Sequence, residues 1–448
     1  MSEVTLIEVL NSREERAKKQ KELLGVYQYP LICFTMNIAG PIKTSPLIER
    51  SFFEGIRLLK EHLSENDTVY EEVKLLPTGC EAYLSVNDTA SNIKEICTSI
   101  EESARLGRLF DIDVIDKDGK KLERKLPRSC LVCGKPGREC SAGRIHSVDE
   151  LQSVTNKIME EYFFPIDKEQ CSSLAVKSLL DEVYTTPKPG LVDRRNNGSH
   201  TDMDITTFER SAKALKPYFS ECFSIGKRTS GLSLEDAFSV LRKAGVEAEK
   251  AMFNATRGVN THKGAIYSMG ILCASVGRLW RVEKPFAGIY LICKECAEIV
   301  KESVKNDFEN IDNKTAGGRL YLQYGIKGIR GEVLSGFSSV LNISLPIYCE
   351  LLKNNYSEND AGAISLLYLI AHITDTNLCK RGGIKGAEDA MKQVQELLID
   401  YPYPDNRQIE VLDDAFIAKN LSPGGCADLL SVTYFLYAIS VQENKKGR

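Results

Sequence analysis

The chain has 448 residues, of which 43% are hydrophobic, and this is enough for two or three ordinary domain cores. Its net charge of −4 and pI near 5.9 exclude a general polyanion-binding surface, so we expect no nucleic-acid partner. Fourteen scattered cysteines and the lack of a leader-like N-terminus or an apolar run of about 18 residues favour a cytoplasmic protein with free thiols and no membrane contact.

Residues 1–165 predict a domain of mixed helices and strands. Apolar periodicity predicts helices over residues 4–25, 47–63 and 90–106. Pro46 lies at the first position of the second helix. Short β-rich runs predict strands over residues 30–37, 69–76 and 81–86. This mixture indicates an α/β or α+β fold.

The strand that follows Gly107 carries Asp111 and Asp113 two residues apart, so both carboxylates point to one side of a sheet. Two such carboxylates repel each other unless a cation lies between them. Mg²⁺ bound by carboxylates and substrate phosphates is a common solution. The alternative is a half-exposed edge strand whose acids face water.

A group of thiols follows the strand. Cys130 and Cys133 form a CxxC pair, and Cys140 and His146 come after it. These four side chains predict a Cys₃His zinc site, and the alternative is a set of free thiols in a loop. Four neighbouring arginines can bind phosphates or form a solvated face: Arg124, Arg128, Arg138 and Arg144.

Five motifs of this half belong together. They are Arg13-Glu-Glu-Arg16, Gly40-Pro-Ile-Lys-Thr-Ser-Pro-Leu-Ile48, Thr78-Gly79 with Glu81-Ala82, Gly107-Arg-Leu-Phe-Asp-Ile-Asp113, and Arg128-x-Cys-Leu-x-Cys133 with His146-Ser147. Over residues 1–160 they resemble the holo-citrate-lyase synthase family (CitX). The resemblance implies transfer of phosphoribosyl-dephospho-CoA from its triphosphate precursor to a serine of the citrate lyase acyl carrier (gamma) subunit, with release of diphosphate. Asp111 and Asp113 then hold Mg²⁺, and Lys43, Arg108 and Arg128 are candidate phosphate ligands.

Residues 166–448 predict a second, nearly all-α domain, because apolar residues recur at helical spacing and alternating runs are scarce. The expected helices span residues 168–184, 205–225, 233–256, 263–279, 285–304, 331–352 and 360–374.

The stretch from Thr186 to Met203 is punctuated by proline and glycine and predicts a loop. A long loop inside a compact domain usually has a function, and this one is dense in polar groups: Asp193, Arg194, Asn196, Ser199, His200 and Asp202. We interpret it as an active-site loop. A serine–histidine–aspartate triad is disfavoured, because consecutive residues cannot easily reach that geometry.

Further polar loops precede helices. In the segment Asn260-Thr261-His262-Lys263-Gly264, Thr261 is a candidate helix cap and the free N–H groups can bind a phosphate. Similar segments are Gly317-Gly318-Arg319, Gly328-Ile-Arg330-Gly331, Asp375-Thr-Asn377 with Arg381-Gly382-Gly383, and Ser422-Pro-Gly424-Gly425-Cys426-Ala-Asp428. Together they indicate a polyphosphate cradle. Alternatively, the histidines bond loop carbonyls and Asp375 stops a helix.

The segments Thr186–Met203, Asn260–Gly264 and Ser422–Leu429 resemble the triphosphoribosyl-dephospho-CoA synthase family (CitG) over residues 168–440. The resemblance implies that ATP and 3′-dephospho-CoA are the substrates and that adenine is released. Asp193, Asp202 and Asp375 then bind Mg²⁺ or face the sugar. Lys263, Arg194 and Arg330 bind phosphates, and His200 or His262 acts as base. Asn196, Ser199, Asn260, Thr261, Asn377, Gly424 and Gly425 are further candidate nucleotide contacts.

Together the two resemblances predict a cytoplasmic bifunctional transferase that matures citrate lyase. Three alternatives remain open at this stage. The first half can be a carrier-binding module without catalysis, or the carrier can belong to malonate decarboxylase. A non-enzymatic regulator that binds dephospho-CoA is the third.

Overall fold

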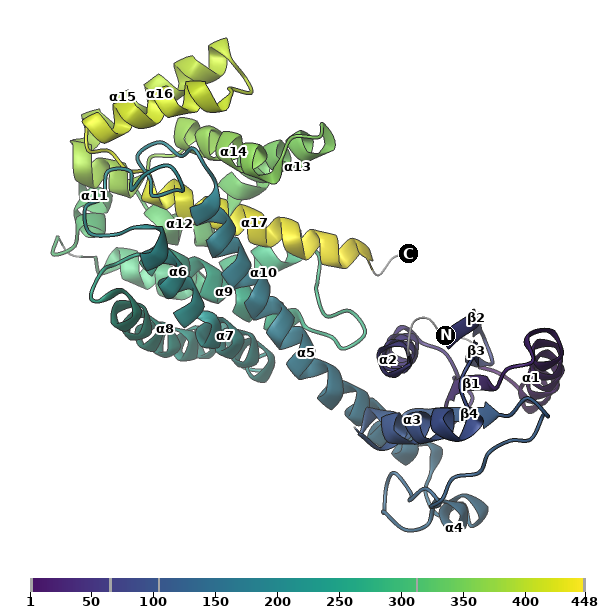
Figure 1. The fold of residues 1–448 in the computed structure, drawn as a ribbon. Coiled ribbons are helices and arrows are strands. Elements are labelled where there is room, and N and C mark those ends of the chain that lie inside the picture. Colours follow the sequence, from purple (N-terminus) through teal and green to yellow (C-terminus); the bar gives the residue numbers. More distant parts are fainter. Residues whose placement is uncertain (1–2, 64–66, 104, 312, 446–448) are drawn as a thin grey trace. The chain divides into compact units, whose positions relative to one another are not determined.

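The computed structural model describes residues 3–63, 67–103, 105–311 and 313–445. The chain divides into two compact units, Met1–Ile166 and Asp167–Arg448 (Figure 1), called unit 1 and unit 2 below. Helix α5 (Val148–Tyr184) contains the boundary and has Pro165 inside it. The predicted helix start at Lys168 is therefore wrong, because the helix already begins at Val148.

Unit 1 contains a four-stranded sheet in the order β2-β3-β1-β4. All three pairings are antiparallel, so the unit is of the α+β kind. The strands are β1 (Leu31–Met36), β2 (Thr68–Leu76), β3 (Gly79–Val86) and β4 (Phe110–Ile115). The helices are α1 (Leu6–Tyr27), α2 (Pro46–His62), α3 (Ala90–Ser103), η2 (Leu106–Leu109) and α4 (Gly137–Ala142). Helix α1 continues past its predicted end at Gly25 and stops at Gln28, which has a positive φ.

The sheet of unit 1 has one apolar and one partly polar face. On the apolar face Phe34 stacks on Phe52 of α2 with ring centroids 4.8 Å apart. On the other face Leu23 of α1 packs with Cys33 and Tyr83. Cross-strand partners point to the same side, so this second face carries two rows of side chains. The rows are Lys74–Glu81–Thr35–Asp111 and Glu72–Tyr83–Cys33–Asp113.

Unit 2 is built of helices. They are α6 (Ile205–Ala214), α7 (Lys216–Arg228), α8 (Leu234–Thr256), α9 (Lys263–Leu279), α10 (Ile289–Glu309), α11 (Ala316–Tyr324), α12 (Gly328–Leu334), η3 (Val340–Ser344), α13 (Leu345–Lys353), α14 (Glu358–His372), α15 (Thr376–Asp400), α16 (Asn406–Ala418) and α17 (Gly424–Lys445). Helices α7 and α9 touch backbone to backbone, because a Cβ on Gly226 would lie 2.0 Å from the carbonyl oxygen of Ala274. This contact needs glycine.

Several predicted helix boundaries in unit 2 are wrong. The segment 205–225 is divided at Leu215, where α7 restarts with Pro217 in its first turn. The segment 331–352 is broken at Gly336 and Phe337, which both have positive φ. Three predicted loops lie inside helices: Gly317-Gly318-Arg319 in α11, Gly328-Ile-Arg330-Gly331 in α12, and Arg381-Gly382-Gly383 in α15, which bends at Gly383.

Helix α17 passes the length and composition test for a membrane span over Gly424–Glu443, with mean hydropathy 1.3. The expectation that no such run exists is therefore wrong. However, 61% of this window is buried inside the fold, as in the core helix of a globular unit.

Candidate active sites

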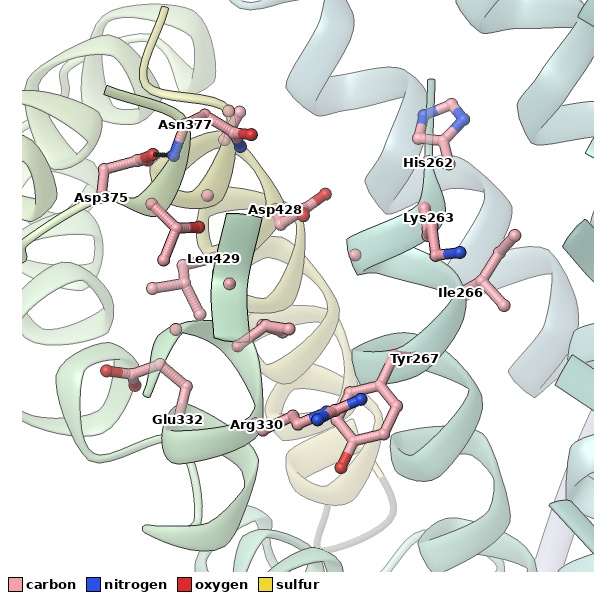
Figure 2. A pocket seen from close by; sticks show the side chains of 18 of the residues that line it. His262, Lys263, Ile266, Tyr267, Arg330, Glu332, Asp375, Asn377, Asp428 and Leu429 are labelled. Atoms are coloured by element: carbon pink, nitrogen blue, oxygen red, sulfur yellow. Dashed lines mark hydrogen bonds between the residues drawn. The ribbon is translucent and has the colours of Figure 1, made fainter. Parts of the chain in front are cut away.

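Unit 2 encloses a cavity of about 1440 Å³ (Figure 2), larger than the 300–1,000 Å³ of a typical small-ligand pocket. The first turns of α9, α12, α15 and α17 lie in its wall, and helix N-termini attract anions. Of the residues predicted from sequence, the cavity brings together His200, Asp202, Asn260, Thr261, His262, Lys263, Arg330, Asp375, Asn377, Gly424 and Gly425. The cavity thus has the room and the polarity for two nucleotide substrates.

Asp375 joins the first turns of two helices in this wall. Its Oδ1 accepts the N–H groups of Asn377 (2.6 Å) and Leu378 (3.2 Å) at the start of α15. Its Oδ2 accepts the N–H of Cys426 (2.8 Å) at the start of α17. A Cβ on Gly425 would lie 3.0 Å from the same Oδ2, so this glycine leaves room for the carboxylate. Burial raises the pKa of Asp375.

Asp428 of α17 lies half-buried in the cavity wall (Figure 2). It accepts the N–H of Ala265 in the first turn of α9. A Cβ on Gly264 would lie 1.8 Å from its Oδ2, so glycine leaves room for the carboxylate in this position. Burial and the negative charges of Glu182 and Asp375 raise the pKa of Asp428 well above its usual range.

Glu182 and Lys188 complete this acidic group. Both are buried, and Lys188 Nζ donates to Glu182 Oε1 (2.5 Å) and to its carbonyl oxygen (2.6 Å). Lys188 is therefore paired with Glu182, and burial raises the pKa of Glu182. A divalent cation beside these carboxylates would offset their mutual repulsion, which adds to burial in raising the pKa of Asp428.

Sequence reasoning did not single out Glu182, Lys188 or Asp428 as site residues. Lys188 and Asp428 lie inside the motif loops and were available to it. Glu182 lies in the last turns of α5, and no local pattern distinguishes it from any helical glutamate.

The two histidines have different surroundings. His262 is buried, its Nδ1 lies 2.7 Å from Ser211 Oγ, and its Nε2 has no partner among the described residues. Burial lowers the pKa of His262 to about 3, so the free imidazole is neutral. His200 Nε2 lies 2.9 Å from Ser422 Oγ. Burial, and then the charge of Arg381, lower the pKa of His200.

The cationic and polar side chains predicted to contact the nucleotide have other partners within the fold. Thr261 does not cap α9 as predicted: it donates to Ser211 Oγ (2.7 Å), and Asn260 Oδ1 accepts the N–H of Lys263 (3.3 Å). Lys263 Nζ pairs with Glu249 (2.7 Å), and Arg330 lies 3.8 Å from Asp307. Both cations line the cavity and can exchange these half-buried partners for phosphates.

The middle of the Thr186–Met203 loop, residues 193–199, lies outside the cavity lining, whereas Lys188, Leu191 and Val192 before it reach the cavity. Asp193 is buried, and both of its carboxylate oxygens accept loop N–H groups, from Lys188, Arg195 and Asn196. The other predicted contacts outside the lining also have partners. Arg194 lies over the Tyr184 ring, Asn196 donates to Asp413, and Ser199 donates to the carbonyl of Leu421.

These contacts change the expected effect of replacing Asp193. Asp193→Ala leaves three backbone donors without their acceptor, and we expect the free energy of unfolding to fall by about 2 kcal/mol or more. Urea unfolding of the full chain measures this. Asp389→Asn, an exposed change on α15, is the control. An unchanged unfolding midpoint with lost activity would instead favour the predicted role of Asp193 as a metal ligand.

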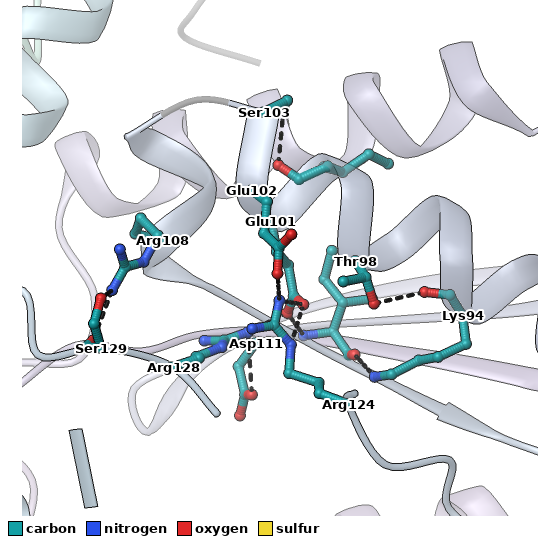
Figure 3. A network of polar contacts seen from close by, with 12 residues as sticks. Lys94, Thr98, Glu101, Glu102, Ser103, Arg108, Asp111, Arg124, Arg128 and Ser129 are labelled. Carbon is teal, nitrogen blue, oxygen red and sulfur yellow. Dashed lines mark hydrogen bonds and ion pairs between the residues drawn. The ribbon is translucent and has the colours of Figure 1, made fainter. Parts of the chain in front are cut away.

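In unit 1 the acids Asp111 and Asp113 share the partly polar sheet face, as predicted, and a cation lies near each. Figure 3 shows Asp111 with Arg128. Lys121 Nζ lies 2.6 Å from Asp113 Oδ2, and Arg128 Nη2 lies 4.0 Å from Asp111 Oδ1. Asp111 is exposed and Asp113 is half-buried. The pair is therefore accessible to a substrate phosphate and a cation.

The same face continues into a smaller cavity of about 440 Å³ beside α1. Here Glu81 is buried and accepts bonds from Arg16 Nε (2.9 Å) and the Tyr83 hydroxyl (2.5 Å). Lys74 and Thr78 also line this cavity. Arg16 and Glu81 belong to the motifs quoted above, but sequence reasoning did not assign them to a site.

Two other predicted phosphate ligands of unit 1 donate hydrogen bonds to backbone carbonyl groups. Lys43 Nζ donates to the carbonyl of Ile38 (2.6 Å), and burial lowers the pKa of Lys43. Arg108 Nη2 donates to the carbonyl (2.6 Å) and the Oγ (3.0 Å) of Ser129. Arg124 and Arg128 both bind the buried carboxylate of Glu101, so this pair is not a free, solvated basic face.

A helical unit with a large cavity of acids and cations, and a sheet unit with paired carboxylates, define a two-part nucleotide-handling enzyme. Residues 168–447 match the family CitG, described as ATP:dephospho-CoA triphosphoribosyl transferase. Residues 4–162 match the family CitX, described as apo-citrate lyase phosphoribosyl-dephospho-CoA transferase.

Full-length relatives combine both parts. The chain is 36% identical over 453 residues to "Protein CitXG" of Haemophilus influenzae, which covers 97% of this chain and 96% of the relative. It is 35% identical over 465 residues to "Protein CitXG" of Leuconostoc mesenteroides subsp. cremoris, with 97% of each covered. A synthase of Haemophilus ducreyi, "2-(5''-triphosphoribosyl)-3'-dephosphocoenzyme-A synthase", is 37% identical over 69% of this chain and 99% of its own. The chain therefore belongs to the CitXG family of bifunctional transferases.

Proposed function

We propose that unit 2 transfers the triphosphoribosyl group of ATP to the 2′-hydroxyl of 3′-dephospho-CoA and releases adenine. Unit 1 then transfers phosphoribosyl-dephospho-CoA to a serine of the citrate lyase acyl carrier (gamma) subunit and releases diphosphate. The main structural support is the cavity of unit 2, where a group of acids and several helix N-termini face one space large enough for both nucleotides. Fourteen free cysteines favour a reducing, cytoplasmic setting.

In unit 2 the C1′–N9 bond of ATP breaks and a C1′–O bond forms to the acceptor hydroxyl. Positive charge develops on the sugar, as in glycoside chemistry. The carboxylates of Asp428, Asp375 and Glu182 provide negative potential for it. Asp375 and Asp428 would also hold Mg²⁺, which supplies charge neutralisation on the triphosphate when bound. Lys263, Arg330 and the first turns of α9 and α17 bind the phosphates.

His262 is the better candidate for the base that takes the hydroxyl proton. Its Nε2 is free in the cavity wall, and Ser211 fixes the ring through Nδ1. An anionic nucleotide beside it raises the low pKa of the free ring towards the working range of a base. His200 is already bonded to Ser422 and lies against Arg381, which favours a positioning role.

In unit 1 the serine hydroxyl of the carrier attacks the α-phosphorus of the precursor, and the bond to diphosphate breaks. Asp111 and Asp113 would hold Mg²⁺, which neutralises the departing diphosphate when bound. Lys121 and Arg128 stand beside the two carboxylates and can pair with phosphate oxygens as the charge moves.

The decisive experiment incubates the full chain with apo carrier, ATP, Mg²⁺ and 3′-dephospho-CoA, and follows the carrier by mass spectrometry and adenine by chromatography. We expect free adenine and a carrier heavier by one phosphoribosyl-dephospho-CoA group. Adenine without a modified carrier would favour a non-catalytic first unit. Modification of the malonate decarboxylase carrier alone would reassign the partner, and absence of adenine would favour a regulatory dephospho-CoA binder.

A further inference from the structure

The segment that follows β4, residues 116–147, has little regular structure apart from the six-residue helix α4. Four side chains within it converge. The donor atoms of Cys130, Cys133, Cys140 and His146 all lie within 4.8 Å of one another. A tight turn presents the first two thiols, since Cys130 N–H donates to the carbonyl of Lys135 (2.6 Å) and Gly134 N–H donates to that of Cys130 (3.1 Å).

His146 gives a second, independent observation. Its Nε2 is buried and has no hydrogen-bond partner among the described residues. Its Nδ1 lies 3.2 Å from Glu150 Oε2. A carboxylate on one ring nitrogen and a metal on the other is the usual arrangement of a metal-bound histidine, because the carboxylate fixes the ring and its tautomer.

We propose that Cys130, Cys133, Cys140 and His146 bind one structural Zn²⁺. Zinc–sulfur bonds of about 2.3 Å in a tetrahedron place ligand atoms about 3.8 Å apart, which agrees with the observed clustering. All four positions are filled by protein, so the ion has no open position for catalysis. On binding, the thiols release their protons to solvent and coordinate as thiolates.

A disulfide fits the geometry less well. The sulfurs of Cys133 and Cys140 lie 3.4 Å apart, whereas a disulfide requires about 2.05 Å. It would also leave Cys130 unpaired and the buried Nε2 of His146 without a partner. A tetrahedral cation uses all four groups at once.

The ion has a defined task in unit 1. Arg124 and Arg128 come shortly before the segment that the ion closes and bind the buried Glu101, and Arg128 also lies 4.0 Å from Asp111 (Figure 3). Cys130 is two residues from Arg128, so the metal holds this arginine beside the carboxylate pair. This part rests on the proposed function of unit 1, and it makes Arg128 a residue that zinc positions.

The test measures zinc by plasma mass spectrometry in full-length protein purified without chelators. We expect about one zinc ion per chain, and near-complete loss of zinc in His146→Ala and in Cys133→Ser. Cys349→Ser, at a half-buried thiol of α13, is the matched control and should retain the metal. Co²⁺ in place of zinc should give the absorption bands of a tetrahedral thiolate site.

Activity adds a second readout. In the two ligand variants we expect carrier loading to fall at least tenfold while adenine release, which belongs to unit 2, stays within twofold of the unmodified chain. Three results would overturn the inference: protein that holds no zinc and takes none from a zinc buffer, zinc that both ligand variants retain, or a Cys133–Cys140 disulfide in freshly prepared protein. Zinc bound normally by a chain that never loads the carrier supports the metal site and contradicts only the proposed function.

Discussion

Asp428→Asn is expected to lower adenine release by about 100-fold or more, while the free energy of unfolding of the ligand-free chain stays the same or rises. Asp428 is exposed to the negative charges of Glu182 and Asp375, and Lys188 is paired with Glu182. The amide removes one of the repelling charges and can still accept the N–H of Ala265, so the fold loses nothing. The same change removes the cavity carboxylate that we propose faces the sugar and the cation. Steady-state adenine release and urea unfolding measure the two effects.

This opposite movement of activity and stability distinguishes a site residue from a structural one. Asp389→Asn on the exposed face of α15 makes the same chemical change away from the cavity and should alter neither quantity. If Asp428→Asn releases adenine at a near-normal rate, the acidic group is not the reactive centre. If it unfolds the chain, its role is structural.

Asp111→Ala is expected to abolish carrier loading, by about 100-fold or more, and to leave adenine release unchanged. Asp111 is exposed, so the loss of its side chain makes no cavity in the sheet. The pair with Asp113 then cannot hold a divalent cation against the departing diphosphate. Loading of the carrier with purified precursor measures unit 1 without unit 2.

Asp118→Asn, at an exposed position three residues beyond β4, is the control for that change. A carrier-binding module without catalysis predicts a different pattern. In that case Asp111→Ala would bind the carrier as well as the unmodified chain does, and neither chain would load it. The measured ratio of loading to binding therefore separates the two interpretations of unit 1.

The sequence predicted the elements that follow simple periodicity. The strand Phe110–Ile115 with its paired acids and the helix that starts at Pro46 lie where they were expected. The predicted helix ends were wrong where a residue near the end has an unusual backbone conformation. Gln28 and Phe337 take positive φ, and Pro165 is accommodated inside α5. The type of a single residue does not reveal such a backbone conformation, because packing against other segments selects the conformation.

The sequence predicted only part of the cavity lining of unit 2, and the reason is physical. Glycine loops that enter helices can be recognised, because close approach and helix capping restrict the residue types. The sequence does not show which side chains of these loops face the cavity. Asp193 and His200 lie seven residues apart in one loop, yet Asp193 binds backbone and His200 lines the cavity. Glu182 comes from a helix with no motif and is brought in only by the tertiary fold.

Asp375 connects the starts of α15 and α17 through one carboxylate. Any cation or nucleotide that binds this carboxylate must therefore affect the first turns of both helices. These helices begin nearly fifty residues apart in the chain. Amide hydrogen exchange at Asn377 and at Cys426 should slow in step as ATP and Mg²⁺ are added, with one common midpoint. We therefore expect ligand binding and the ordering of both helix starts to occur together.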